Sequence, residues 1–420
     1  MTVILRPHQV EALQTMTQFD KGQVVVPTGG GKTFIMIRHA IQRFNVNSVA
    51  KTMVVVAPRI LLAQQLCDDF LGQNLDGNYN VGIDVLHVHS GKGKHLNTTK
   101  INEINNWYHN SIKHQIIFTT YHSLHKLMDS EIEVDSIYFD EAHNSTTKSF
   151  FPATDHFSRN ASKCYFFTAT PKHNYRGKVG MNWSDTYGNI ICNIPAPDLI
   201  DNGSIIPPTI VPFHVDDTIK RTKRDEHNAD AHAVIKSLEH IENRSSDYCI
   251  QRKVLVAVGS SRILGNMLGQ TDMLSRCKEL GYDVLHVTSK FGAYVNDKKV
   301  SRQEFMTTLS EWGNDDTKKF IVFHYSILSE GINISGLTHC ILLRNLNYIE
   351  MTQTIGRVIR LHNDDKVKLK NNIIKSGQLN FYRKSTGYVT VPTTRKEIRR
   401  RLEKVVHTVF VEGQPIFYYK

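Results

Sequence analysis

The sequence has no apolar run long enough to cross a membrane, because nothing in it approaches the ~18 to 20 uninterrupted apolar residues that a span requires. The amino terminus also lacks the apolar core of a targeting signal, since Arg6, Pro7 and His8 interrupt it at once. These absences exclude the membrane and secreted classes. We therefore expect a soluble protein of the cytoplasm, with the nucleus as the alternative compartment.

Cysteine is scarce, with 6 widely spaced residues and no Cys-x-x-Cys pair. This excludes a disulfide framework or a zinc ribbon and predicts reduced, mostly buried thiols. Histidine is more frequent, and His87 and His89 would lie on the same face of a strand. No cysteine or carboxylate cluster nearby completes a tetrahedral set of ligands, so a zinc site is not expected.

Internal repeats and low-complexity tracts are also missing, which excludes a solenoid. With 40% hydrophobic and 22% charged residues, the composition is that of an ordinary globular protein. The length of 420 residues exceeds what one hydrophobic core usually organises. Two lobes of ~150 to 200 residues are therefore expected.

Basic residues outnumber acidic ones, and the net charge is +11. Residues 362–420 hold 13 basic and 5 acidic residues, so this segment alone carries +8. A basic excess concentrated in one tail predicts a polyanionic partner, most simply nucleic acid, and a solvated basic face is the alternative.

Short β-branched runs alternate with helical stretches, a pattern typical of βαβ units and parallel sheets. The predicted strands are residues 23–26, 52–57, 81–88, 115–119, 136–139 and 163–168, then 253–258, 282–288, 318–324 and 339–343. A stretch rich in Pro, Asn and Gly after Thr170 predicts the interdomain linker.

The predicted fold is α/β, with two tandem parallel-sheet domains and a short basic C-terminal extension. The first lobe is assigned to residues 1–195, the linker and second lobe to 196–361, and the extension to 362–420. Within the extension, two strands at residues 388–391 and 407–411 are expected to flank a basic helix at 395–404.

Residues 27–33 read Pro-Thr-Gly-Gly-Gly-Lys-Thr and stand between an apolar strand and an amphipathic helix. The glycines let backbone N–H groups curl around a phosphate at a helix N-terminus. Lys32 can reach the β and γ oxygens, and the Thr33 hydroxyl can ligate magnesium. Val26 stands where the general pattern has its first glycine, and a plain glycine-rich turn is the alternative.

An apolar strand also leads into residues 140–143, which read Asp-Glu-Ala-His. Asp140 can hold magnesium through water, while Glu141 can orient and deprotonate an attacking water. Acidic strand ends are common in α/β proteins, so it is the pairing with the phosphate loop that favours a catalytic site.

These two motifs, followed by Thr-Ala-Thr-Pro at residues 168–171, resemble the first motor lobe of superfamily 2 helicases and translocases. Further segments resemble the family's remaining motifs in order: residues 5–9, 57–59, 119–121, 258–261, 329–333 and 353–360. The resemblance implies two RecA-like lobes that hydrolyse ATP with Mg²⁺ at their interface. Asn333 stands where many relatives carry aspartate.

The resemblance also implies roles for individual residues. The implied catalytic residues are Lys32, Asp140, Glu141, Gln353, Arg357 and Arg360, with the two arginines three apart on one helical face. Implied ATP contacts are Arg6, Gln9, Thr28, Gly29, Gly30, Gly31, Lys32, Thr33 and Gly331; magnesium contacts are Thr33 and Asp140; coupling residues are His143, Thr168 and Thr170.

Nucleic-acid contacts are expected where hydroxyls and basic side chains follow strands or line the tail. The expected residues are Pro58, Arg59, Thr119, Thr120, Ser260, Thr288, Arg399, Arg400 and Arg401. Ordinary strand-end threonines are the alternative. Residues 290–302 mix aromatic and basic side chains, as a strand-separating element would, but a loop covering the sheet edge is the favoured interpretation.

The motif spelling is more similar to DNA helicases of the branch-migration, repair and restriction-motor groups than to DEAD-box RNA proteins. The predicted function is therefore ATP-dependent unwinding or translocation of DNA. The alternatives are an RNA helicase, the motor of a restriction or defence complex with further protein partners, and a nucleotide-switched clamp that does not hydrolyse ATP. The compact length resembles small phage and viral helicases, for which the compartment would be the host cytoplasm.

Overall fold

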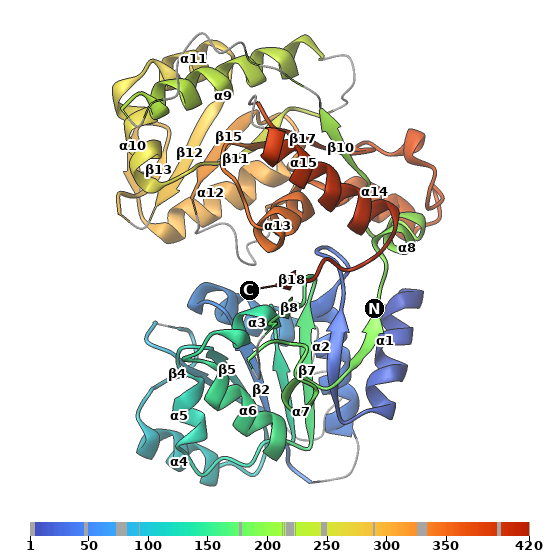
Figure 1. Ribbon diagram of the computed structural model, residues 1–420. Helices are drawn as coiled ribbons and strands as arrows, with labels where there is room; N and C mark the ends of the chain where they lie inside the picture. The colour runs from blue at the N-terminus through green and yellow to red at the C-terminus, as the bar shows by residue number, and fades with distance from the viewer. Residues whose placement is uncertain are drawn as a thin grey trace. The chain divides into compact units, whose positions relative to one another are not determined.

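The computed structural model describes residues 5–45, 49–72, 82–91, 93–175, 179–211, 213, 215, 222, 224–244, 250–288, 290–325, 334–392 and 396–419. The chain divides into two compact units, each with its own sheet (Figure 1). The first unit comprises Met1–Ile194 and Pro415–Lys420, and the second comprises Pro195–Gln414.

The sheet of the first unit has eight strands, all parallel. In spatial order they are β4 (Leu96–Asn97), β3 (Ile83–Val88), β5 (His114–Thr120), β2 (Thr52–Ala57), β6 (Ser136–Phe139), β7 (Lys163–Thr168), β1 (Lys21–Val25) and β9 (Ile190–Asn193). The helices are α1 (Pro7–Gln18), α2 (Lys32–Asn45), α3 (Ile60–Gly72), α4 (Ile101–His109), α5 (Leu124–Met128), α6 (Phe151–Asn160) and α7 (Ser184–Tyr187).

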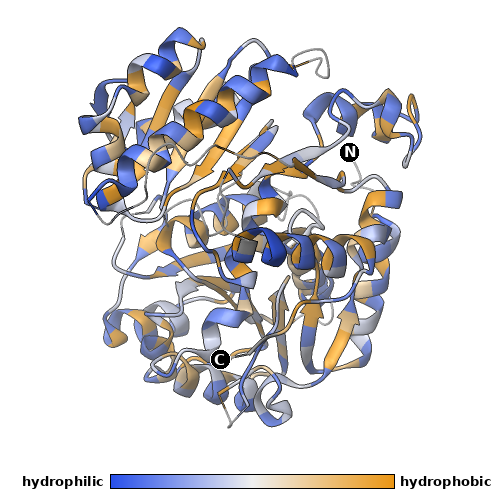
Figure 2. Ribbon diagram, turned by 45° about the horizontal axis from the view of Figure 1, so that its top comes forward, coloured by the Kyte–Doolittle hydropathy of each residue, from blue (hydrophilic) through white to orange (hydrophobic). Residues whose placement is uncertain are grey.

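The central strands are largely apolar and buried because helices cover both faces of the sheet. Every residue of β2 and β5 is buried. Figure 2 shows these apolar strands inside the unit and hydrophilic residues on the outward helical faces. The sheet therefore forms the middle layer of a three-layer α/β core.

Strand order places the phosphate loop next to the carboxylates. Strands β6, β7 and β1 are neighbours, and all three run in the same direction. The segments that leave their carboxyl ends are residues 140–141, 168–170 and 26–33. Because carboxyl ends of parallel strands share one edge of the sheet, these three segments meet there.

The second unit has a mostly parallel sheet of eight strands. In spatial order they are β10 (Pro208–Val211), β17 (Gly387–Thr390), β16 (His339–Leu342), β11 (Lys253–Ala257), β15 (Phe320–His324), β12 (Asp283–Thr288), β13 (Gly292–Val295) and β14 (Lys298–Val300). Among the described strand pairs of this sheet, β12–β13 and β13–β14 are antiparallel and the others are parallel. The helices are α8 (Ala196–Asp201), α9 (Glu226–Asn243), α10 (Ser261–Gln270), α11 (Met273–Glu279), α12 (Arg302–Asn314), α13 (Tyr348–Val358), α14 (Asn363–Lys370) and α15 (Lys396–Val405).

The predicted architecture of two parallel-sheet α/β domains is confirmed. The segment assigned to a C-terminal extension supplies β17, which lies between β10 and β16 inside the second sheet. The segment assigned to the linker begins with β8 (Lys172–His173) and contains α7, β9 and α8. Near the chain end, β18 (Tyr418–Tyr419) pairs in parallel with β8 in the first unit.

The predicted strand at residues 407–411 is wrong, because residues Val406–Val411 form a π-helix that continues α15. The β-branched residues suggested a strand, but Leu402, Val405 and Val409 are buried at helical spacing. One continuous apolar stripe therefore keeps the segment helical. Among the described residues, no helix has the length and apolarity to cross a bilayer.

Candidate nucleotide-hydrolysis site

The phosphate loop takes the left-handed backbone conformation that its glycines permit. Gly29 has φ 90° and Gly31 has φ 86°. A Cβ atom on Gly31 would lie 2.6 Å from Nε2 of Gln9, so a larger residue would displace the Gln9 side chain as well as strain the backbone. Helix α2 then begins at Lys32, and its first N–H groups face the loop.

The amino-terminal motif packs directly against this loop. The Arg6 backbone N–H donates to Oε1 of Gln9 at 3.0 Å. His8 is buried, and its Nε2 donates to the Gly30 carbonyl at 2.9 Å. The sequence prediction assigned roles to Arg6 and Gln9 but missed His8. Its place between them in the Leu-Arg-Pro-His-Gln segment was the available signal.

The two carboxylates lie at the end of β6 and are both buried. Nζ of Lys32 lies 3.2 Å from Oε1 of Glu141, so the helix after β1 and the turn after β6 are joined by an ion pair. Glu141 has φ 46°, a left-handed conformation that is costly for a residue with a side chain. This conformation turns the chain sharply after Asp140.

Burial and the adjacent Glu141 carboxylate raise the pKa of Asp140 above its ordinary value. A divalent cation would offset this destabilisation of the charged form, so the buried carboxyl fits a magnesium-binding role. The Asp140 backbone is fixed from two sides: its N–H donates to the Val56 carbonyl at 2.9 Å, and its carbonyl accepts from the Tyr121 hydroxyl at 2.8 Å.

The predicted coupling residues connect Glu141 to the end of β7. Nδ1 of His143 lies 3.6 Å from Oε2 of Glu141 and 3.1 Å from Oγ1 of Thr168. The Thr170 N–H donates to the same Thr168 hydroxyl at 3.1 Å. The Thr168 carbonyl accepts from the N–H of Val26, just before the phosphate loop. A polar chain therefore runs from Glu141 to the segment that carries Lys32.

Two threonine hydroxyls at this edge of the sheet, those of Thr28 and Thr170, are buried and have no hydrogen-bond partner among the residues that the structure describes. A buried hydroxyl without a partner is costly unless it meets a ligand or water. Thr28 lies in the phosphate loop, and Thr170 follows β7. Thr33 lies in the first turn of α2 and is partly exposed.

The predicted arginines lie in the second unit. Gln353 and Arg357 are buried on α13, and Arg360 follows two residues after the helix ends. Burial and then the charges of Arg357 and Arg344 lower the pKa of His324 to about 3, so Arg357 has a neutral imidazole beside it. Gly331 lies outside the described residues, as does the rest of the predicted segment 329–333.

The predicted nucleic-acid residues of the first unit differ in accessibility. Arg59 is exposed, whereas Pro58 and Thr120 are buried. Thr119 is fully buried, and its hydroxyl donates to the Val88 carbonyl at 2.8 Å. This internal bond is the strand-end role that the sequence analysis held as the alternative for Thr119.

In the second unit, Ser260 caps α10 by accepting from the Ile263 N–H, and the Thr288 hydroxyl accepts from the Phe291 N–H. Residues 290–302 contain the hairpin β13–β14, which extends the sheet at its β12 edge. The Phe291 ring covers Gly265 of α10. These contacts place the segment along the sheet edge, as the favoured interpretation expected.

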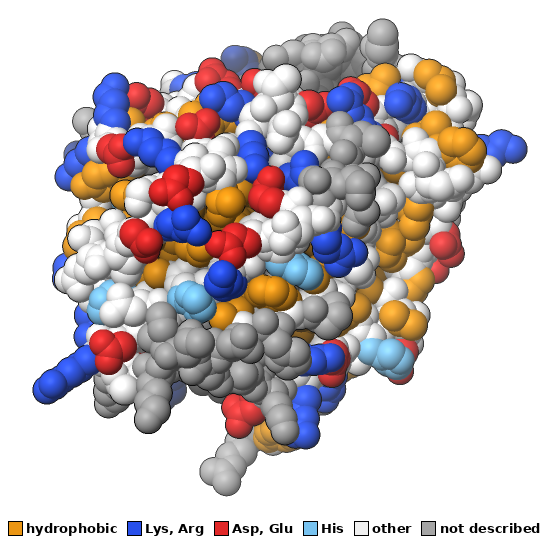
Figure 3. Space-filling view, turned by 90° about the horizontal axis from the view of Figure 1, so that it is seen from above, with side chains coloured by type: hydrophobic (Ala, Val, Ile, Leu, Met, Phe, Trp, Pro, Cys, Tyr) orange, Lys and Arg blue, Asp and Glu red, His pale blue; other side chains and the backbone are white. Residues whose placement is uncertain are grey.

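The predicted basic helix is α15, which the structure describes from residue 396, so Arg395 lies outside the described residues. Arg400 is exposed, and Arg399 is exposed but paired with Glu403. Arg401 instead donates to the Asn345 side chain and to the Leu346 carbonyl. The three arginines are therefore not equally accessible. On the face seen in Figure 3, basic and acidic side chains are interspersed.

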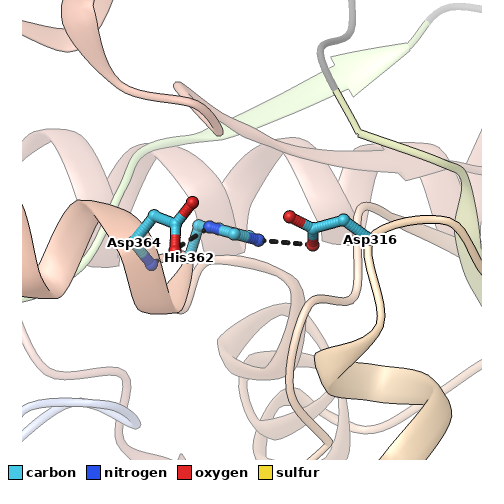
Figure 4. Close-up of side chains that lie close together, drawn as sticks. All are labelled: Asp316, His362 and Asp364. Carbon is cyan, nitrogen blue, oxygen red and sulfur yellow. Dashed lines mark hydrogen bonds and ion pairs between the residues drawn. The ribbon is translucent and has the colours of Figure 1, made fainter.

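One group of described residues has metal-ligand spacing: Asp316, His362 and Asp364 (Figure 4). Nε2 of His362 bonds Oδ1 of Asp316 at 2.8 Å, while its Nδ1 accepts from the Asp364 backbone N–H. Arg383 pairs with both carboxylates. Because both ring nitrogens and both carboxylates already have partners, the group is an ion-pair network that anchors residues 362–383.

The histidine pair considered from the sequence lies at the end of β3. Nδ1 of His87 and Nε2 of His89 are 3.1 Å apart, and both rings are buried. Burial lowers the pKa of both, so the rings are neutral and bonded to each other. No cysteine or carboxylate joins them in a metal-ligand group among the residues that the structure describes.

Comparison with known proteins agrees with this fold. Residues 2–173 match the family model described as type III restriction enzyme, res subunit. No curated protein matches the chain. The ATP-dependent Type ISP restriction-modification enzyme LlaBIII, solved bound to DNA, is similar with a TM-score of 0.69 and 15% identity, covering 100% of this chain and 31% of the enzyme.

Two further solved structures are similar. A nuclease-deletion mutant of the Type ISP enzyme LlaGI, in complex with a DNA substrate mimic, gives a TM-score of 0.54 at 16% identity, covering 96% of this chain and 29% of that one. S. cerevisiae Dbp5, bound to RNA and ADP BeF3, gives a TM-score of 0.55 at 13% identity. The match covers 98% of this chain and 89% of Dbp5. The chain thus spans under a third of the Type ISP enzymes.

The two parallel-sheet units give the chain the tandem RecA-like fold that it shares with these solved structures. Residues 2–173 are similar to the res subunit of type III restriction enzymes, and this match covers less than half of the chain.

Proposed function

We propose that the chain is a nucleic-acid-stimulated ATPase that translocates on or unwinds DNA. The observation that carries the proposal is the connected set Lys32, Glu141, His143 and Thr168, which joins a phosphate loop to a candidate base and to the strand end beyond it. A catalytic base linked to a second polar segment is what coupling of hydrolysis to movement requires.

In the proposed reaction, the backbone N–H groups of residues 29–33 and Nζ of Lys32 bind the phosphates of ATP. Lys32 exchanges Glu141 for a phosphate oxygen, which frees the carboxylate to orient and deprotonate water. Thr33 and Asp140 would hold Mg²⁺, which supplies charge neutralisation for the transferred phosphoryl group. Gln9 and Arg6 would bind the adenine.

Arg357 and Arg360 are proposed to complete the reaction by stabilising the charge that develops on the γ-phosphoryl group. This requires the two units to approach each other during turnover. The segment of Gly331 is proposed to contact the nucleotide. For the nucleic acid, the exposed Arg59 and Arg400 are the best placed of the predicted contacts.

DNA is preferred over RNA on motif spelling and on the two Type ISP neighbours, which were solved with DNA or a DNA mimic. The RNA alternative is supported by the likeness to Dbp5. The motor part of a larger restriction assembly is a second candidate, favoured by the family match and by the share of the Type ISP enzymes that this chain spans.

The decisive experiment compares ATP turnover in the presence of single-stranded DNA, duplex DNA, forked DNA, RNA and a DNA–RNA hybrid. We expect the largest stimulation with a DNA substrate. Stimulation by RNA and by none of the DNA substrates would identify RNA, in place of DNA, as the nucleic acid on which the protein acts. ATP binding without turnover under every condition would instead favour the nucleotide-switched clamp.

A further inference from the structure

The carbonyl groups at the end of α13 are bonded by segments from elsewhere in the second unit. Nζ of Lys384 donates to the carbonyls of Val358 at 2.7 Å and Arg360 at 2.9 Å. The Ile206 N–H donates to the intervening Ile359 carbonyl at 2.9 Å. A helix leaves its last carbonyls without partners of its own, so these bonds determine how the chain leaves α13.

Lys384 is itself held firmly in place. The fully buried Asp365 accepts the backbone N–H groups of Arg383 at 2.8 Å and Lys384 at 3.1 Å. A Cβ atom at Gly387 would lie 2.3 Å from the Val358 carbonyl oxygen, so the following segment also lies against the end of the helix. The lysine is 4% exposed. Its position is therefore determined by backbone bonds and close packing.

We propose that Lys384 is a positioning residue, which acts through its ammonium group on the end of α13 and thereby sets the orientation of Arg357 and Arg360 for ATP hydrolysis. The inference rests on the proposed ATPase function. Arg357 is one residue before Val358, and the Arg360 carbonyl is bonded by Lys384 directly. A positive charge also interacts favourably with the negative end of the helix dipole.

The charge on this lysine is sensitive to pH near neutrality. Burial, followed by the charges of Arg360 and Lys366, lowers the pKa of Lys384 to about 7. The carboxylate of Asp365 acts to raise this pKa, and the charge of Lys253 lowers it further. Lys384 is therefore ionised below about pH 7 and neutral above it. Since an arginine in its place would stay charged throughout, the two side chains can be compared across this range.

The test uses the full-length chain and three variants. Lys384→Met removes both the donors and the charge, and Lys384→Arg keeps them. Lys370→Met is the matched control, because Lys370 is an exposed lysine of the neighbouring α14. We expect Lys384→Met to lower kcat by ~10 to 100-fold with the KM for ATP within about twofold, Lys384→Arg to recover most of the rate, and the control to match wild type.

The second measurement is the ratio of wild-type to Lys384→Arg kcat from pH 6 to 9, in which groups common to both proteins cancel. We expect the ratio to fall as pH rises through ~7, because only the lysine loses its charge. This measurement does not use Lys384→Met, so it tests the proposal even if that variant fails to fold. A flat ratio overturns the proposal, as does a Lys384→Met kcat within twofold of an active wild type. A wild type without ATPase activity refutes the proposed function instead.

Discussion

Lys32 and Glu141, 109 positions apart in the sequence, form a largely buried ion pair with Nζ and Oε1 3.2 Å apart. The pair brings the lysine that we propose to bind phosphate and the candidate base into one site on the edge of the first sheet. In the proposed reaction, ATP would therefore compete with Glu141 for Lys32.

Lys32→Ala should abolish hydrolysis and weaken ATP binding, because the ammonium group that binds the phosphates is removed. Glu141→Gln should leave ATP bound but lower kcat by ~10² to 10⁴-fold, because only water activation is removed. Equilibrium binding of a fluorescent ATP analogue and a steady-state ATPase assay measure the two effects. Wild-type turnover by Glu141→Gln would disprove the assignment of Glu141 as the base.

Arg357→Ala should reduce kcat by ~10³-fold or more while ATP affinity stays close to that of wild type, because the arginine acts on charge that develops in the transition state. Binding and turnover are measured on the same preparation. Arg276→Ala is the control, since Arg276 forms surface ion pairs on α11. A defect confined to affinity would assign Arg357 to ground-state binding.

His8→Phe should raise the KM for ATP about fivefold with little change in kcat, because the loss of one hydrogen bond of ~1 kcal/mol loosens the phosphate loop. The substitution eliminates the bond from the imidazole to the Gly30 carbonyl. The exposed His109 provides the control variant His109→Phe. Equal KM values for His8→Phe and wild type would show that this bond has no part in nucleotide binding.

The basic tail helix should bind the nucleic-acid backbone through its exposed arginines. A variant with Arg399→Gln and Arg400→Gln should weaken binding similarly across sequences and reduce the salt dependence by ~0.7 to 0.9 log units for each phosphate that the variant no longer neutralises. Arg401→Gln is measured separately, because Arg401 has bonds within the second unit. Fluorescence anisotropy at several salt concentrations gives the slopes, and an unchanged slope in the double variant would leave α15 as a solvated face.

The Arg43–Asp135 pair should make the first unit's stability depend on pH. Burial opposes ionisation, but hydrogen bonds from Arg43 and Ser136 prevail and hold the pKa of Asp135 below its ordinary value. The stabilisation is therefore present above about pH 4 and lost as pH falls through the lowered pKa. Asp135→Asn should lower the free energy of unfolding by ~1 to 3 kcal/mol at pH 7. The difference in Tm between this variant and wild type should disappear on acidification. A gap that stays constant with pH would contradict this.

The local pattern was enough to predict the class of fold. Short, largely apolar runs such as residues 52–57 are typical of strands covered on both faces, and their alternation with helices predicts parallel sheets. The prediction failed at residues 407–411, where β-branched residues are held in a helix by burial against the second unit. Propensity acts locally, and tertiary packing overrides it.

The sequence by itself determined the chemical inventory of the site, because a phosphate loop and a pair of carboxylates have spacing that local geometry dictates. Only the tertiary structure decided which of those side chains meet: strand order makes β6, β7 and β1 neighbours and so brings Glu141 to Lys32 and to His143. It also decided which carbonyls Lys384 contacts, those of Val358 and Arg360, which lie far from it in the chain. A contact of this kind depends on packing that no local pattern encodes, since a lone lysine in a sequence resembles any solvated one.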